Sequence, residues 1–257
     1  MLQKNSEIVM QQLKPGDVVL DIGGWAHPFN RANYVLDLGP YETRGFYNRT
    51  FARNNPIPPI GGTVEVFTKE TWVARDICAK EPYPFRDKEL DFVVCSHTLE
   101  DIRDPLWVCS EMIRIGKAGY IEVPSRLWET CRGMERGITG LSHHRWLIDI
   151  EAAANSIRFL QKFHRIHNWR CSLPESVLRK LRVEQTAQWL FWNGSFEFRE
   201  DVIHGEEEQL GEMERFVARH HTYPPLLLAA DARLMRAAGL YRRAVNKARR
   251  MLLGSQA

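Results

Sequence analysis

Short apolar segments recur through the first half of this 257-residue chain, and most are followed at once by a carboxylate or by turn residues. Apolar runs of this length between turn signals are typical of β-strands. We expect strands at residues 18–21, 34–38, 72–77, 90–96 and 119–123. The fourth run, LDFVVCS, is apolar on both faces, which favours a central strand of a parallel sheet.

A helix signal separates the last two of these strands. Asp104 and Pro105 suit the first positions of a helix, which we expect to continue to Ile115 and to end at Gly116. Alternating strands and helices predict an α/β fold with a doubly wound, mostly parallel, Rossmann-like sheet. Ligands of such sheets bind beyond the carboxyl ends of the strands.

The second half of the chain predicts an α+β extension. Residues 143–150 and 156–163 indicate a hairpin, residues 188–198 indicate a strand pair around Asn193 and Gly194, and residues 206–220 indicate a charged helix. We therefore expect a cofactor-binding core at 1–126, an acceptor-side region of hairpins and helices at 127–222, and a basic amphipathic helix at 223–257.

A glycine turn and a carboxylate give the first indication of a ligand. Gly23 and Gly24 follow the first strand, where they let the backbone approach a ligand, and Asp37 ends the second strand, where it can accept from both hydroxyls of a ribose. This pattern indicates an adenosine-type ligand. The alternative is a plain chain reversal with a solvated aspartate.

Linked motifs make the indication more specific. VVLDIGGWAHPFNRANYVLDL and the later stretch RDICAKEPYPFRDKELDFVVCSHTLEDIRDPLWVCSEMIRIGKAGYIEVPSR resemble the class I S-adenosylmethionine-dependent methyltransferases, in particular the group with a methyltransferase type 11 domain. The resemblance covers roughly residues 15–126. The motifs occur in the family's order, whereas any one of them alone would be a weak signal.

The resemblance implies S-adenosyl-L-methionine as the cofactor and S-adenosyl-L-homocysteine as its product. By that resemblance, Asp21, Gly23 and Gly24 hold the methionine end, Asp37 holds the ribose, Asp76 and Ile77 contact the adenine, and Ser96 and His97 lie beneath the sulfonium.

The chain departs from the family pattern at two places. Trp25 stands at the second glycine position of the turn, where we expect the indole to pack beside the methionine moiety; the alternative is that it fills the site of a protein that no longer methylates. Asp101 and Ile102 replace the usual histidine region after Glu100.

Methyl transfer depends mainly on aligning donor and acceptor, and a hydroxyl acceptor also profits from a general base. His144, with His143 beside it, is the expected base, and Glu122, Arg126 and Glu129 are the expected acceptor-binding residues. Either histidine could instead be structural. We expect no metal, because adjacent residues of a strand face opposite ways and no H-x-H, H-E-x-x-H or paired CxxC motif occurs.

Composition restricts the setting. No apolar run is long enough to span a membrane, the N-terminus lacks a signal-peptide core, and five scattered cysteines form no disulfide framework, so we expect a cytoplasmic protein.

The net charge of +3 is concentrated at the C-terminus, because residues 231–253 hold seven Lys and Arg against Asp231. This amphipathic segment suits packing on the domain or peripheral contact with the inner face of the membrane, and it is weak support for nucleic acid.

The leading hypothesis is therefore a methyltransferase acting on a sugar or other small polar acceptor, with a place in cell-envelope glycan biosynthesis. The alternative is a methyltransferase-like binding or scaffold protein without catalysis. A nicotinamide-dependent oxidoreductase is disfavoured, since GGWAHP stands where G-x-G-x-x-G would be needed. The sequence gives no oligomeric state.

Overall fold

The computed structural model describes residues 1–52, 56–135, 138–202 and 205–220, with six single positions between 230 and 241. The chain forms two compact units. The first consists of Met1–Glu129, Ser142–Phe163 and Arg182–Val202, and the second of Thr130–Leu141, His164–Leu181 and Ile203–Ala257. The basic segment expected as a helix at 223–257 lies outside the described residues except at those single positions.

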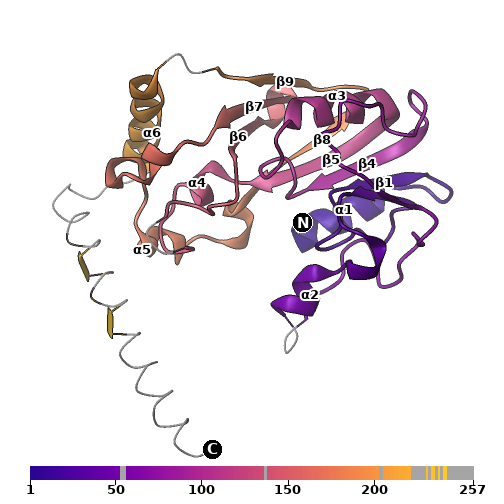
Figure 1. The fold of residues 1–257 in the computed structure, drawn as a ribbon, viewed down its shortest axis with the longest axis horizontal. Helices are drawn as coiled ribbons and strands as arrows, with labels where there is room; N and C mark the ends of the chain where they lie inside the picture. The colour runs from indigo at the N-terminus through magenta and orange to yellow at the C-terminus, as the bar shows by residue number, and fades with distance from the viewer. Residues whose placement is uncertain are drawn as a thin grey trace, which may run out of the picture. The chain divides into compact units, whose positions relative to one another are not determined.

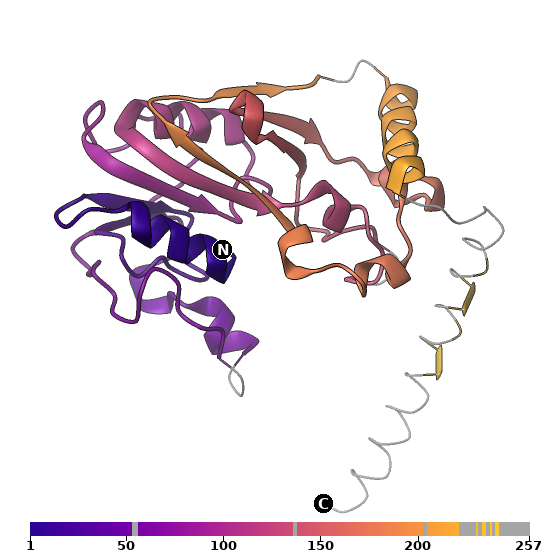
Figure 2. The same cartoon turned by 180° about the vertical axis from the view of Figure 1, so that it is seen from behind.

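The first unit is built on a six-stranded sheet with the strand order β3-β2-β1-β4-β5-β8. Its strands are β1 (Val19–Ile22), β2 (Tyr34–Asp37), β3 (Trp72–Ala74), β4 (Leu90–Ser96), β5 (Gly116–Pro124) and β8 (Ala187–Asn193). The first five are parallel, and β8 runs antiparallel to β5 along the edge (Figure 2). The expected mostly parallel α/β sheet is confirmed.

Helices lie on both faces of this sheet (Figure 1). Helix α1 (Gln3–Gln12) places Val9 in one core cluster with Val19, Val35 and Val94, while α3 (Pro105–Ile115) packs on the opposite face, against Leu20, Val93 and Ile121 among others. Alternate residues of each strand therefore enter different cores, as a strand buried on both faces requires.

A second sheet, of order β6-β7-β9, completes the core on the α3 side. It contains β6 (Trp146–Glu151), β7 (Ser156–Gln161) and β9 (Glu197–Glu200), and β6 and β7 form the expected antiparallel hairpin. The pair expected within 188–198 is wrong, because β8 joins the main sheet and β9 pairs in parallel with β7.

Short helices connect these strands: η1 (Tyr41–Thr43), α2 (Phe46–Thr50), α4 (Arg126–Glu129), η2 (Ala152–Ala154) and η5 (Val183–Gln185). Helix α3 begins as expected, since the Asp104 side chain accepts from the Trp107 N–H at 2.9 Å and Pro105 opens the first turn.

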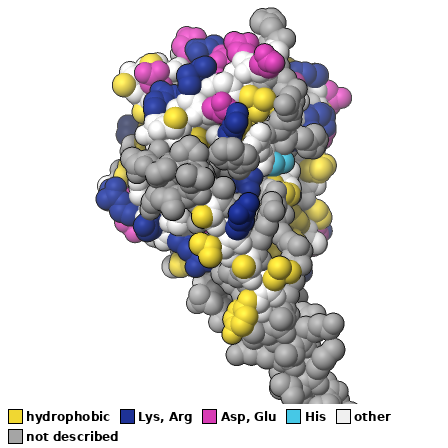
Figure 3. Space-filling view, turned by 90° about the vertical axis from the view of Figure 1, so that its left-hand side faces the viewer, with side chains coloured by type: hydrophobic (Ala, Val, Ile, Leu, Met, Phe, Trp, Pro, Cys, Tyr) yellow, Lys and Arg dark blue, Asp and Glu magenta, His cyan; other side chains and the backbone are white. Residues whose placement is uncertain are grey.

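The second unit contains η3 (His164–His167), η4 (Trp169–Cys171), α5 (Glu175–Leu178) and α6 (Glu206–His220). The charged helix expected at 206–220 is confirmed, and it packs against η3 and η4. Acidic and basic side chains are interspersed towards the top of the face in Figure 3. Among the described residues, no helix is long and apolar enough to cross a membrane.

Candidate active site

The carboxyl ends of β1, β2, β4 and β5 lie at one edge of the main sheet because these strands are parallel. Gly23 directly follows β1, Asp37 ends β2 and Ser96 ends β4. Residues that the sequence places in the cofactor site therefore meet at the edge where ligands of such sheets bind.

The turn after β1 requires both of its glycines. Gly23 has a φ of 79°, and a Cβ there would lie 2.1 Å from the Thr98 hydroxyl oxygen. A Cβ at Gly24 would lie 2.1 Å from Asp21 Oδ2. The absence of side chains lets this turn fold tightly over the Asp21 carboxyl group.

Asp21 lies inside this turn with 3% of its surface exposed. Its Oδ2 atom accepts from the Phe29 N–H at 2.8 Å. Burial raises the pKa of Asp21 to about 7, and the nearby Asp37 carboxylate adds to the shift. The carboxyl group therefore keeps its proton at pH values well above those at which an exposed aspartate loses it.

Backbone groups hold the carboxylate of Asp37 at the end of β2. Oδ2 accepts from the Trp25 N–H at 3.0 Å, and Oδ1 accepts from the Gly39 N–H at 2.7 Å. Burial raises the pKa of Asp37, and no Lys or Arg of the described chain forms an ion pair with it. Backbone N–H groups, that of Leu38 included, are the donors given for this carboxylate, so lone pairs remain for a neutral ligand with hydroxyl donors.

The Trp25 side chain lies beside this carboxylate. Its indole packs directly on Gly39 and stacks on Phe46, with ring centroids 4.8 Å apart and planes 19° apart. Nε1 donates to the Thr43 hydroxyl at 2.9 Å. The half-buried indole thus lies next to the turn that carries Asp37.

Of the two residues expected at the adenine, Asp76 makes polar contacts and Ile77 packs in the core. Asp76 accepts from the Cys78 N–H at 2.8 Å and pairs with Arg103 at 2.6 Å, and the first of these bonds is the main reason that its pKa is lowered. The Ile77 side chain belongs to the hydrophobic core. Ser96, expected beneath the sulfonium with His97, has a buried hydroxyl oxygen without a hydrogen-bond partner among the described residues.

His97 forms a charged cluster with two buried carboxylates. Its backbone has a φ of 52°, its Nε2 atom lies 3.1 Å from Glu122 Oε1, and its Nδ1 atom lies 3.5 Å from Glu100 Oε1. Burial opposes protonation of His97, but the hydrogen bonds with Glu100 and Glu122 outweigh it and raise the pKa to about 9. The imidazole is therefore a cation at neutral pH.

The three residues expected to bind the acceptor are all buried. The Glu122 carboxylate is fully buried and accepts from the Leu2 N–H at 2.8 Å and from the Asn5 amide at 3.0 Å, an arrangement suited to positioning His97. Arg126, at the start of α4, pairs with Asp149 at 2.7 Å. Glu129, at the end of α4, belongs to a separate cluster.

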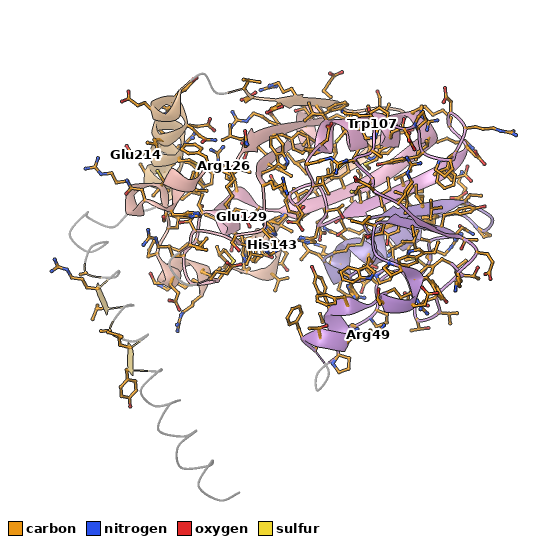
Figure 4. The ribbon with its side chains drawn as sticks, viewed as in Figure 1. Arg49, Trp107, Arg126, Glu129, His143 and Glu214 are labelled. Carbon is orange, nitrogen blue, oxygen red and sulfur yellow. The ribbon has the colours of Figure 1, made fainter. Side chains whose placement is uncertain are left out.

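That cluster joins α4 to the segment before β6. The His144 Nδ1 atom lies 2.7 Å from Glu129 Oε1, and the Lys162 ammonium lies 2.9 Å from Glu129 Oε2. The His143 and His144 rings are 4.6 Å apart, and Glu129 and His143 lie close together in Figure 4. All of these groups belong to the first compact unit.

Asp101 completes the cluster from the loop after β4. Its Oδ1 atom lies 3.7 Å from His144 Nε2. Burial, and then the neighbouring Glu100 charge, raise the pKa of Asp101 to about 7. Burial lowers the pKa of His144, but the hydrogen bond with Glu129 raises it, and the net shift is upward.

Sequence reasoning did not assign roles to Asp101, Glu100 or Lys162. Glu100 belongs to the S-H-x-L-E motif, and Asp101 was noted only as a departure from it. Lys162 follows the hairpin strand and carried no signal, because its partner Glu129 lies 33 residues away.

Comparisons with known proteins give matches among solved structures alone. No family model matches the chain, and no curated protein matches it. Solved structures do match. A methyltransferase in complex with the Haloferax volcanii Trm112 methyltransferase activator is 18% identical, with 47% of this chain and 51% of that chain covered and a TM-score of 0.32.

Two further matches have similar values. A SAM-dependent methyltransferase from Methanosarcina mazei is 21% identical, with 56% of this chain and 85% of that chain covered and a TM-score of 0.33. The N-terminal domain of EvdMO1, solved with SAH and D-fucose, is 15% identical, with 57% of each chain covered and a TM-score of 0.32.

The chain spans about half the length of the first of these proteins. The α/β fold itself is given by the strand order and the parallel pairing of this chain, and the solved structures that match it include SAM-dependent methyltransferases.

Proposed function

We propose that this protein is an S-adenosyl-L-methionine-dependent methyltransferase that methylates an oxygen of a small polar acceptor such as a sugar. The observation that carries the proposal is the Asp37 carboxylate, which is desolvated, lacks a paired cation among the described residues, and stands next to a two-glycine turn at the ligand-binding edge of the sheet. A ribose diol would add hydroxyl donors to the backbone N–H groups that already bond this carboxylate.

The residues at this edge fit the cofactor. Asp37 would accept from the ribose hydroxyls, and the turn of Gly23 and Gly24 would lie against the methionine end, with Asp21 beneath it. Trp25 would pack along the side of the ligand. When bound, S-adenosyl-L-methionine supplies a methyl group activated by a positively charged sulfur.

The acceptor would bind at the cluster of Asp101, His143 and His144. Because Nδ1 of His144 is engaged by Glu129, Nε2 is the atom left to act on an acceptor hydroxyl. Glu129 is itself fixed by Lys162, so the imidazole orientation is set before any acceptor arrives. Preorganisation of this kind is what an alignment-dependent reaction requires.

The association with cell-envelope glycans and a contact of the basic C-terminal segment with the inner face of the membrane are part of the same proposal. Both derive from the sequence: the first from the family resemblance, the second from the seven Lys and Arg of residues 231–253.

Binding of S-adenosyl-L-homocysteine tests the proposal, by calorimetry on the full chain. We expect wild-type binding, and Asp37→Ala should weaken it by about 1 to 3 kcal/mol, because ribose donors lose a half-buried charged acceptor. The matched control is Asp17→Ala, which removes a carboxylate that precedes the amino end of β1, away from the proposed site. Wild-type affinity in the Asp37 variant would make this residue a spectator.

Two results would favour the alternatives. If neither S-adenosyl-L-homocysteine nor S-adenosyl-L-methionine raises the melting temperature, the chain is a methyltransferase-like binding protein. If NAD raises it instead, an oxidoreductase is favoured. Incubation with labelled cofactor and acceptor extracts, followed by identification of the labelled product, then names the acceptor.

A further inference from the structure

Three potential metal ligands converge next to the proposed acceptor position. Asp101, His143 and His144 each offer one ligand atom, and these atoms all lie within 4.8 Å of one another. The group ranges from exposed to buried, since His143 is exposed, Asp101 is half-buried and His144 is buried. One side of the cluster is therefore open to solvent while the other is fixed in the protein.

The local backbone explains why adjacent histidines can point to one place. The expectation of no metal rested on a strand, in which neighbouring side chains face opposite ways. In the structure, His143 lies in a turn and β6 begins only at Trp146. The two imidazole rings are 4.6 Å apart with planes 79° apart, so the premise of that expectation does not hold.

His144 is oriented as metal-binding histidines usually are. Its Nδ1 atom is 2.7 Å from the buried Glu129 carboxylate, and this bond leaves Nε2 pointing at Asp101. A carboxylate on the second ring nitrogen fixes the tautomer and the direction of the ligating nitrogen. Lys162 holds the other oxygen of Glu129, which keeps that carboxylate in place.

The position of Asp101 gives separate support for a bound ion. Its Oδ1 atom is buried and has no hydrogen-bond partner among the residues that the structure describes, although His144 Nε2 lies only 3.7 Å away. A direct hydrogen bond would bring these atoms to about 3 Å. Metal–ligand distances of about 2.0 to 2.2 Å place neighbouring ligand atoms of a tetrahedral ion roughly 3.4 Å apart, so the observed gap is close to that of a bridged pair.

We propose that Asp101, His143 and His144 bind a divalent transition-metal ion of the zinc, iron or manganese type. Two imidazoles with one carboxylate favour such an ion over Mg²⁺ or Ca²⁺, which prefer all-oxygen sites. Three protein ligands leave a position for an outside oxygen. Rotation of the exposed His143 side chain would shorten its separations from the other two ligand atoms.

The role assigned to the ion rests on the proposed function, whereas its binding does not. An acceptor oxygen bound at the open position would be polarised by the ion, so His144 would serve the reaction as a ligand and not as the base itself. A chelator separates these roles, since a histidine acting alone as a base works without metal.

Titration of the full-length, untagged, chelator-treated protein with Co²⁺ and Zn²⁺ tests the site. We expect Co²⁺ to give visible absorption bands of a nitrogen- and oxygen-ligated ion at one equivalent, and Zn²⁺ to displace it. His143→Ala and Asp101→Asn should each weaken metal binding at least about 10-fold. Loss of a ligand is expected to reduce metal affinity more than loss of a residue that only hydrogen-bonds to a ligand. His27→Ala, a histidine outside the cluster, is the control.

Three outcomes would overturn the inference. These are no Co²⁺ spectrum in the wild type, equal binding by the two cluster variants and the wild type, or equal weakening by the His27 control. Asp101→Asn keeps the side-chain shape, and circular dichroism and the melting temperature show whether it remains folded. S-adenosyl-L-homocysteine binding by the metal-free protein is measured in parallel, so failure of the metal site leaves the proposed function standing and failure of the cofactor leaves the metal site standing.

Discussion

The buried carboxyl group of Asp21 makes the stability of the fold depend on pH in a direction opposite to that of most carboxylates. Its pKa is raised to about 7 from the ordinary aspartate value of 3.8. The folded protein therefore retains a proton on Asp21 at pH values where the unfolded chain has released it. The stabilisation by this proton is fully present below the unfolded pKa and is lost as pH rises through the folded one.

The size of the effect follows from the shift. One pKa unit corresponds to about 1.36 kcal/mol, so a shift from 3.8 to about 7 corresponds to about 4 kcal/mol over the whole interval. Roughly 2 to 3 kcal/mol of this falls between about pH 5 and pH 7. Asp21→Asn removes the titration while its amide oxygen can still accept from the Phe29 N–H.

Urea unfolding of the wild type and Asp21→Asn from about pH 5 to pH 8 measures the effect, because the other titrating groups cancel in the difference. We expect the wild type to lose about 2 to 3 kcal/mol relative to the variant as pH rises to 7, and only a few tenths of a kcal/mol more above it. Glu184→Gln, at an exposed carboxylate, should follow the wild type. A difference between the wild type and Asp21→Asn that stays constant over this range would refute the reasoning.

The remaining predictions concern the glycine turn, the buried lysine and the proton on Asp21. Gly23→Ala should destabilise the protein by roughly 2 kcal/mol or more in urea unfolding, because φ is 79° and a Cβ would overlap a neighbouring side chain. The control is Gly16→Ala, because Gly16 has a φ of 92° and no atom within 4 Å of an added Cβ. An equal loss of stability in this variant would assign the whole effect to backbone strain. Lys162→Met should cost about 2 to 4 kcal/mol in the same assay, because it removes the ammonium group from the buried Glu129 carboxylate and leaves it bonded to His144; a change near zero would contradict that ion pair. Binding of S-adenosyl-L-homocysteine near pH 6 should release a proton from Asp21, because the ligand's ammonium group favours the carboxylate; calorimetry in two buffers of different ionisation enthalpy would show it, and buffer-independent heats would speak against it.

Local signals predicted the central elements closely. The strand expected at 90–96 is β4 without change, and the helix expected from Pro105 to Ile115 is α3. Both are fixed by features within a few residues: an apolar run between turns in the first, and a capping aspartate with a proline at the first helical position in the second. The carboxylate Asp37 at the end of β2 was found in the same way.

The strands around Asn193 and Gly194 show where local signals fail. The dipeptide indicates a hairpin, yet β8 pairs with β5 and β9 pairs with β7. Each strand could pair with any sheet edge that has unpaired backbone groups. The edge that it joins depends on which edges the rest of the chain leaves unpaired.

The sequence alone determined the parallel sheet, the turn of Gly23 and Gly24, and the carboxylate that ends β2, because each is encoded by residues adjacent in the chain. Only the tertiary structure brought Asp101, Glu129 and Lys162 to His144. These residues are as much as 61 positions apart along the chain. They meet because packing of the β6–β7 hairpin on the main core, and not any short motif, brings these segments together.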